Sequence, residues 1–170
     1  MTCSNCCGHN DHRPCVEYIP CVGPTGPAGP TATNQFLSLG AGAGTELTIA
    51  RTAIQFNAIN AQNGTDITAT IPTTTITLAP NHSYYISYNV NTTATGIGEL
   101  GAVLLLNGNP IDSSASNVSL LVAVAATASL AGGTIITVGS SASTLQLATT
   151  ASIAGIFTLA NAGISIIKLL

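Results

Sequence analysis

Charged residues are scarce in this sequence of 170 residues. They make up 5% of it, against roughly a quarter in ordinary soluble domains. Three Lys and Arg residues and six Asp and Glu residues leave a formal net charge of -3. Binding to nucleic acid requires clustered cations that neutralise phosphates, but Arg13, Arg51 and Lys168 lie far apart in the sequence. The composition therefore excludes a nucleic-acid partner.

Long apolar runs are absent as well, although the mean hydropathy is +0.48. The most apolar segments are 101–108 (GAVLLLNG) and 119–133 (SLLVAVAATASLAGG), and polar residues or glycines interrupt both. Neither reaches the ~18 consecutive apolar residues that a membrane helix needs. A membrane span is not predicted, so the apolar residues must be buried within protein.

Cysteine is absent after position 21. The five cysteines are Cys3, Cys6, Cys7, Cys15 and Cys21. Because five is an odd number, at least one thiol cannot pair within its own chain, which favours disulfides between subunits. Abundant cysteine indicates an oxidising environment. The N-terminus, however, has no charged segment followed by an apolar one, so no signal peptide is predicted.

Two other interpretations of the cysteine segment remain open. Zinc is one, since Cys and His are zinc ligands and they occur here at close spacing. The candidate ligands are Cys3, Cys6, His9, His12 and Cys15. They crowd into 13 residues without an apolar anchor between them, whereas structural zinc sites set two ligand pairs around a small fold. The other is an irregular arm with no redox role.

The chain divides into three predicted regions. Residues 1–22 have no apolar periodicity and contain two prolines, so they are predicted to form an irregular, extended arm. Residues 23–31 are three collagen-like triplets, whose glycines are Gly23, Gly26 and Gly29. In isolation so short a tract fits a stiff proline-rich linker equally well. Residues 32–170 are predicted to form one β domain.

Strand signals dominate this β domain. Residues 82–95 alternate, with Tyr84, Ile86, Tyr88 and Val90 on one face and Tyr85, Ser87, Asn89 and Asn91 on the other. Shorter segments rich in Thr, Ile and Val, each bounded by turn residues, are 66–71, 74–80, 132–140 and 143–150. Asn107-Gly108 predicts a tight hairpin, and the Ala-rich segment 120–131 is predicted to be strand rather than helix. We expect eight to ten strands in two sheets.

Several predicted strands are apolar on both faces. They are Val103 to Leu106, Leu120 to Ala126, and the last strand, where Ile164 and Ile166 oppose Ile167 and Leu169. An antiparallel strand with one face in water alternates apolar with polar residues. Since no spare segment can cover the second face, another copy of the chain is expected to do so, which predicts a homo-oligomer.

No catalytic or cofactor site is predicted. His82 is expected to be a surface or hydrogen-bonding residue. Asp66, Glu99 and Asp112 are isolated in the sequence, whereas a hydrolase of the paired-carboxylate type needs two carboxylates in one cleft. The segment GPTGPAGP lacks the Lys-Ser/Thr of a phosphate-binding loop. The chain is therefore predicted not to be an enzyme.

The order of a short collagen tract, an uncharged Thr/Ala/Ile-rich β domain, a central LLLNGNPI and a terminal AGISIIKLL resembles the collagen-like exosporium glycoproteins of Bacillus spores, the BclA type. This resemblance covers roughly Gly23 to Leu170. It implies a jelly roll related to tumour necrosis factor (TNF) and C1q that forms a homotrimer. The N-terminus departs from that family and is similar to the cysteine-bearing connectors of endospore appendage fibres.

These resemblances imply a structural subunit of a spore-surface fibre or exosporium layer. Trimers would stack through their N-terminal connectors and be joined by disulfides between subunits, with other spore-coat or exosporium proteins as further partners. Such proteins are made in the mother cell without a signal peptide and become oxidised when that cell lyses. Two alternatives from other classes are an adhesin or lectin-like binding head, and a zinc protein that uses the Cys/His arm.

Overall fold

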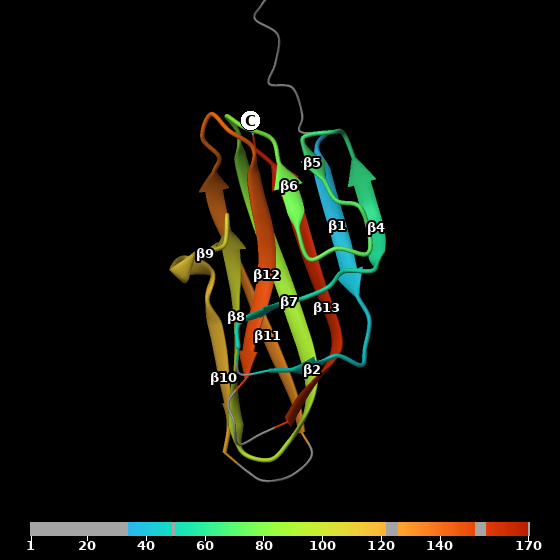
Figure 1. Ribbon diagram of the computed structural model, residues 1–170, viewed down its shortest axis with the longest axis vertical. Coiled ribbons are helices and arrows are strands. Elements are labelled where there is room, and N and C mark those ends of the chain that lie inside the picture. Colours follow the sequence, from blue (N-terminus) through green and yellow to red (C-terminus); the bar gives the residue numbers. More distant parts are fainter. Residues whose placement is uncertain (1–33, 49, 122–125, 152–155, 170) are drawn as a thin grey trace, which may run out of the picture. The chain divides into compact units, whose positions relative to one another are not determined.

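The computed structural model describes residues 34–48, 50–121, 126–151 and 156–169, most of which lie in strands (Figure 1). The thirteen strands in these ranges are β1 Phe36–Ala41, β2 Glu46–Leu47, β3 Thr52–Ala53, β4 Ala58–Asn63, β5 Ile67–Thr68, β6 Ile76–Leu78, β7 Ser83–Thr95, β8 Gly98–Leu106, β9 Asn109–Pro110, β10 Ser116–Leu120, β11 Ala126–Thr137, β12 Ser143–Ala151 and β13 Ile156–Lys168. One short 3-10 helix, η1, spans Asp112–Ser114. Nine of these strands have three or more residues, which agrees with the predicted eight to ten, and the other four are two-residue pairings.

The strands form two antiparallel sheets. The first sheet has the order β11-β7-β13-β1-β4, with β2 attached to β13. The second has the order β10-β8-β12-β6-β5, with β3 attached to β12 and β9 to β8. One continuous apolar core, drawn from strands of both sheets, lies between them. The prediction of an all-β sandwich of two sheets is therefore confirmed.

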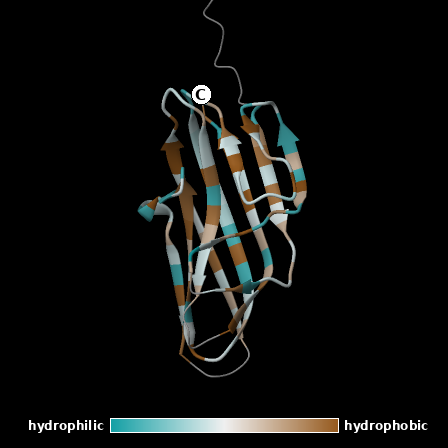
Figure 2. Ribbon diagram, in the orientation of Figure 1, coloured by the Kyte–Doolittle hydropathy of each residue, from teal (hydrophilic) through white to brown (hydrophobic). Residues whose placement is uncertain are grey.

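Strand β7 shows how the sequence builds this core. Its side chains alternate between buried and outward-facing positions over all 13 residues, and Figure 2 shows the matching bands of hydropathy along the long strands. The predicted division into two faces is confirmed, and the buried face is the one whose four members are at most 4% exposed: Tyr84, Ile86, Tyr88 and Val90.

The Tyr88 side chain links the two sheets. Its hydroxyl donates to the carbonyl oxygens of Ala102 on β8 and Ser114 in η1. Space for the ring comes from Gly132 on β11, where an added Cβ would lie 2.6 Å from the Tyr88 hydroxyl. A buried hydroxyl needs such partners because an unpaired one would cost its desolvation free energy.

Strand β8 corrects one expectation about covered surfaces. Val103 and Leu105 face away from the main core, and a second copy of the chain was expected to cover them. They are only 9% and 7% exposed in the single chain, where they form a separate small cluster with Ala148. Because neighbours in the same chain already cover them, they give no support for an oligomer.

The predicted strand over 120–131 is also interrupted. Strand β10 ends at Leu120, Leu121 lies outside any strand and is 80% exposed, and β11 begins at Ala126. Residues 122–125 are outside the described ranges. The segment 120–131 contains no Gly or Pro and therefore carries no turn signal. For this reason the sequence predicted one strand where the structure has two.

The hairpin predicted at Asn107-Gly108 is confirmed. It connects β8 to β9, with positive φ at both positions, 51° and 79°. That geometry belongs to the type I′ turn, whose twist matches the flanking strands. The Asn107 Oδ1 atom also accepts a hydrogen bond of 2.8 Å from the Thr144 amide, which ties the turn to β12.

Candidate assembly surface

Four exposed apolar side chains lie in register across the outer face of the first sheet. Ile135 on β11 is opposite Tyr85 on β7, Tyr85 is opposite Ile167 on β13, and Ile167 is opposite Phe36 on β1. They are 62%, 43%, 39% and 37% exposed in that order. Since neighbouring strands are only ~4.8 Å apart, these side chains form one continuous strip, which we call the apolar row.

Next to the apolar row, the same face is polar but uncharged. The Ser38 and Ser165 hydroxyls lie 3.1 Å apart on β1 and β13. The Asn91 amide donates to Asn161 Oδ1 at 2.8 Å across β7 and β13. Cross-strand bonds of this kind satisfy the polar groups within the chain, so another protein surface can cover them at little desolvation cost.

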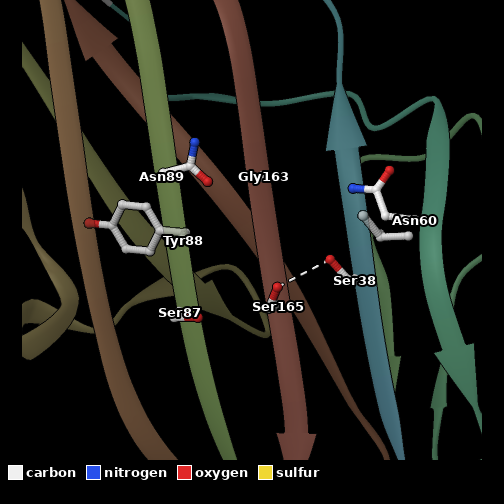
Figure 3. A pocket seen from close by; sticks show the side chains of 8 residues that line it. Ser38, Asn60, Ser87, Tyr88, Asn89, Gly163 and Ser165 are labelled. Atoms are coloured by element: carbon white, nitrogen blue, oxygen red, sulfur yellow. Dashed lines mark hydrogen bonds between the residues drawn. The ribbon is translucent and has the colours of Figure 1, made fainter.

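A shallow hollow of about 240 Å³ opens in this polar part. Figure 3 shows Asn89 and Asn60 on either side of it, with the Ser38–Ser165 pair between β13 and β1. Its floor is open because Gly163 has no side chain; a Cβ there would lie 2.8 Å from Asn89 Oδ1. The hollow can receive a small side chain or water from a covering surface.

Charge is scarce in the six strands of the first sheet. Strands β11, β7, β1 and β4 contain no charged residue, β13 contains only Lys168, and the short strand β2 contains only Glu46. The Lys168 ammonium group is 2.6 Å from Asp66 Oδ2 and partly buried. Copies of this surface therefore do not repel one another electrostatically when they approach.

Asp66 is the centre of a small polar cluster at the end of the sandwich where β1 begins and β13 ends. Besides Lys168, it faces His82, whose Nε2 atom lies 3.9 Å from the carboxylate. The Tyr84 hydroxyl donates to the Ala79 carbonyl oxygen at 3.0 Å. Burial, together with the nearby negative charge of Asp66, raises the pKa of Tyr84 above its ordinary value. The cluster therefore links the end of β13 to the segments that precede β5 and β7 by polar contacts.

The sites predicted from the N-terminal sequence lie outside the described residues. This holds for Cys3, Cys6, Cys7, Cys15 and Cys21, for the alternative zinc ligands His9 and His12, and for the collagen-like glycines Gly23, Gly26 and Gly29. Within the described ranges, no three His, Cys, Asp or Glu side chains lie close enough to hold a metal ion. The same ranges contain no helix that is long and apolar enough to span a membrane.

The apolar row was only half visible in the sequence. Tyr85 and Ile167 were each assigned to one face of their strand, whereas Phe36 and Ile135 were not singled out. The strands that carry these residues are far apart along the chain, so the apolar row can be recognised only when the strand order and register are known. Alternation within one strand carries no information about either.

Comparisons with known proteins agree with this architecture. Residues 40–170 match the family model described as the BclA C-terminal domain. The globular domain of zebrafish complement 1qA protein is similar in structure, with a TM-score of 0.52 at 12% identity over 80% of this chain and 96% of that one. The Eiger TNF of S. frugiperda has a TM-score of 0.51 at 10% identity over 80% and 94%.

At such low identities, these two structures establish the fold alone. They identify the sandwich as a jelly roll of the C1q/TNF type, as the resemblance in the sequence implied. No curated protein sequence matches the chain.

Proposed function

Because the chain belongs to the family of BclA C-terminal domains, we propose that it is a structural, self-assembling protein of the spore surface. The family points to the exosporium or spore surface, and domains of the BclA and C1q/TNF types are typically structural rather than catalytic. In our proposal, residues 32–170 form a homotrimeric head, residues 23–31 a collagen-like tract and residues 1–22 a connector arm.

The apolar row is the observation that carries this proposal. Domains of the C1q/TNF type typically form homotrimers, and the outer face of the first sheet has the properties that such an interface needs. It combines four exposed apolar side chains with paired polar groups and has almost no charge. Covering the half-exposed side chains of the row contributes roughly 4 kcal/mol per protomer before the entropy of association is subtracted.

The connector arm would join one trimer to the next. Five cysteines per chain leave at least one thiol without a partner in its own chain. In a trimer, fifteen thiols (five in each of three chains) would be available for pairing with neighbouring subunits. We propose that disulfides between arms link trimers into a fibre of the endospore-appendage kind or into an exosporium layer. Separating the subunits would then require cleavage of covalent bonds.

Two measurements on the full chain test this proposal. Light scattering under reducing conditions should give three times the 17.0 kDa mass of one chain, because the trimer depends on the β domain. Electrophoresis after boiling in detergent should show large species that collapse to single chains when reductant is added. A monomer in the first measurement would refute the trimeric head. Single chains without reductant in the second would refute the covalent link.

The zinc alternative is distinguished by metal analysis of the reduced protein. Stoichiometric zinc bound through Cys3, Cys6, His9, His12 or Cys15 would favour it, particularly with a monomeric β domain. We expect no stoichiometric metal and a trimer. Replacing all five cysteines with serine should leave the trimer intact while removing the large species, which separates the role of the arm from that of the head.

A further inference from the structure

The outer face of the second sheet contains a trough of about 120 Å³. Its floor is Gly101 on β8, which pairs with Asn117 on β10 on one side and with Thr150 on β12 on the other. Arg51, which precedes β3, and Asp112, at the start of η1, also line it. Four polar side chains from four separate segments therefore line one small trough.

The two side chains next to Gly101 lean over it. A Cβ atom added at Gly101 would lie 2.7 Å from Asn117 Oδ1 and 2.8 Å from Thr150 Oγ1. Because Gly101 has no side chain, the Asn117 and Thr150 side chains can both lie at the bottom of the trough. Pro110 on β9 and Ala115, which follows η1, are exposed and give the trough an apolar wall.

None of the four polar side chains has a partner. Within the described part of the chain, the side chains of Arg51, Asp112, Asn117 and Thr150 form no hydrogen bond or ion pair. On the first sheet, by contrast, two polar pairs bond across strands, Ser38 with Ser165 and Asn91 with Asn161. The trough therefore offers a complete set of unused donors and acceptors in one place.

The chemistry of the set defines the ligand. Arg51 only donates hydrogen bonds, Asp112 only accepts them when ionised, and Asn117 and Thr150 do both. One positive and one negative charge cancel, which disfavours a ligand with net charge of either sign. Adjacent hydroxyl groups, each both donor and acceptor, match these partners, and the carbon face of a ring matches the apolar wall. We propose that the trough binds one neutral monosaccharide unit.

This binding site would make the protein a sugar-binding head as well as a structural one. The trough lies on the second sheet, on the opposite side of the sandwich from the apolar row. Covering the first sheet by other copies would leave it open to solvent. The inference goes beyond the proposed function and does not depend on it, since a single chain already contains all four polar side chains.

Saturation-transfer NMR with the full chain tests the proposal, because this method detects weak ligands of large proteins. The probes are the methyl glycosides of glucose, galactose, mannose, fucose and N-acetylglucosamine, and methyl phosphate serves as a charged comparison. At least one glycoside should give saturation transfer in the millimolar affinity range, and methyl phosphate should give none. No transfer to any of the five glycosides would overturn the proposal.

Three variants locate the site. Asp112→Asn should weaken binding about tenfold, since a hydrogen bond to a charged group is lost. Gly101→Ala should abolish binding because its Cβ displaces Asn117 and Thr150. Glu99→Gln removes a negative charge from the same face, two residues from Gly101, and should leave binding unchanged.

Thermal unfolding should first verify that each variant is folded. If neither Asp112→Asn nor Gly101→Ala alters the signal, the sugar binds elsewhere and the assignment is wrong. Light scattering on the same samples reports the oligomeric state separately, so a failure of the trimer and a failure of the sugar site give different results.

Discussion

On the first sheet, the outward side chains combine an exposed apolar row with Ser and Asn groups that bond to one another. On the second sheet, they combine apolar residues that the chain already covers with a trough lined by four polar side chains that form no hydrogen bond or ion pair within the described residues. The two outer faces therefore differ in what they can bind. The first sheet has apolar side chains that a partner can cover, and the second sheet has donors and acceptors that a ligand can pair with.

This comparison shows that exposure, and not apolar character alone, distinguishes an interface from a covered surface. Val103 and Ile135 are both β-branched aliphatic residues on outward faces. Val103 is 9% exposed and Ile135 is 62% exposed. Covering Ile135 with a partner surface would contribute appreciable hydrophobic free energy, whereas covering Val103 would not, because this free energy scales with the area removed from water.

Charges placed in the apolar row should have the largest effect. In the double variant Tyr85→Glu/Ile135→Glu, each protomer would have to bury two unpaired carboxylates to associate, which costs several kcal/mol per charge. We expect complete dissociation of the trimer to the 17.0 kDa chain in light scattering. The control is Thr77→Glu, an exposed position on β6 of the second sheet, which should remain trimeric. A double variant that stays trimeric would place the interface elsewhere.

Truncation at adjacent positions of β8 compares the two sides of the second sheet. Leu104 is 0% exposed in the main core, and Leu105 is 7% exposed in the small outer cluster. Leu104→Ala should lower the free energy of unfolding by about 3 kcal/mol, and Leu105→Ala by about 1 kcal/mol, because fewer neighbours surround the second cavity. Urea denaturation measures both. Equal losses would mean that the outer cluster is packed as tightly as the core.

Removal of single tyrosine hydroxyl groups compares the buried and the outward face of β7 in the first sheet. Tyr88→Phe leaves the carbonyl oxygens of Ala102 and Ser114 without their buried donor and should cost about 1–2 kcal/mol of unfolding free energy. Tyr85→Phe, on the outward face of the same strand, should cost less than about 0.5 kcal/mol. If both variants unfold at the same urea concentration, the link from Tyr88 to the second sheet contributes nothing to stability.

The smallest effect appears only in alkali. The pKa of Tyr84 is raised by burial and by Asp66, so the folded chain holds the phenolic proton more firmly than the unfolded chain does. The protonated Tyr84 hydroxyl therefore contributes fully to the free energy of unfolding below pH 10.0, the ordinary tyrosine pKa. This contribution is lost as the pH rises through the raised pKa of Tyr84. Tyr84→Phe should therefore flatten the fall in urea midpoint above pH 10.0. An unchanged slope would assign that fall to other groups, such as Tyr88, whose pKa burial also raises.

Much of the fold is predictable from local patterns. The alternation in residues 82–95 separated the two faces of β7, and Asn107-Gly108 identified the hairpin, because both depend on neighbours in the sequence. The break at Leu121 could not be predicted this way. An uninterrupted apolar segment satisfies the alternation rule equally well on either side of a break between strands.

The two candidate surfaces needed the tertiary structure. Ser38 and Ser165 are 127 residues apart in sequence and form a hydrogen-bonded pair. The trough likewise unites Arg51, Asp112 and Thr150 from separate segments. Composition predicted that apolar surface would be left over, but only strand order and register determine which residues share a face.

The position of β1 has a mechanical consequence. This strand lies between β13 and β4 and is bonded to both along its length. A force that pulls at Phe36 along the strand axis would load all of those hydrogen bonds in shear at the same time, instead of opening them one after another as in a zipper. The domain would therefore strongly resist a force applied at Phe36 along β1.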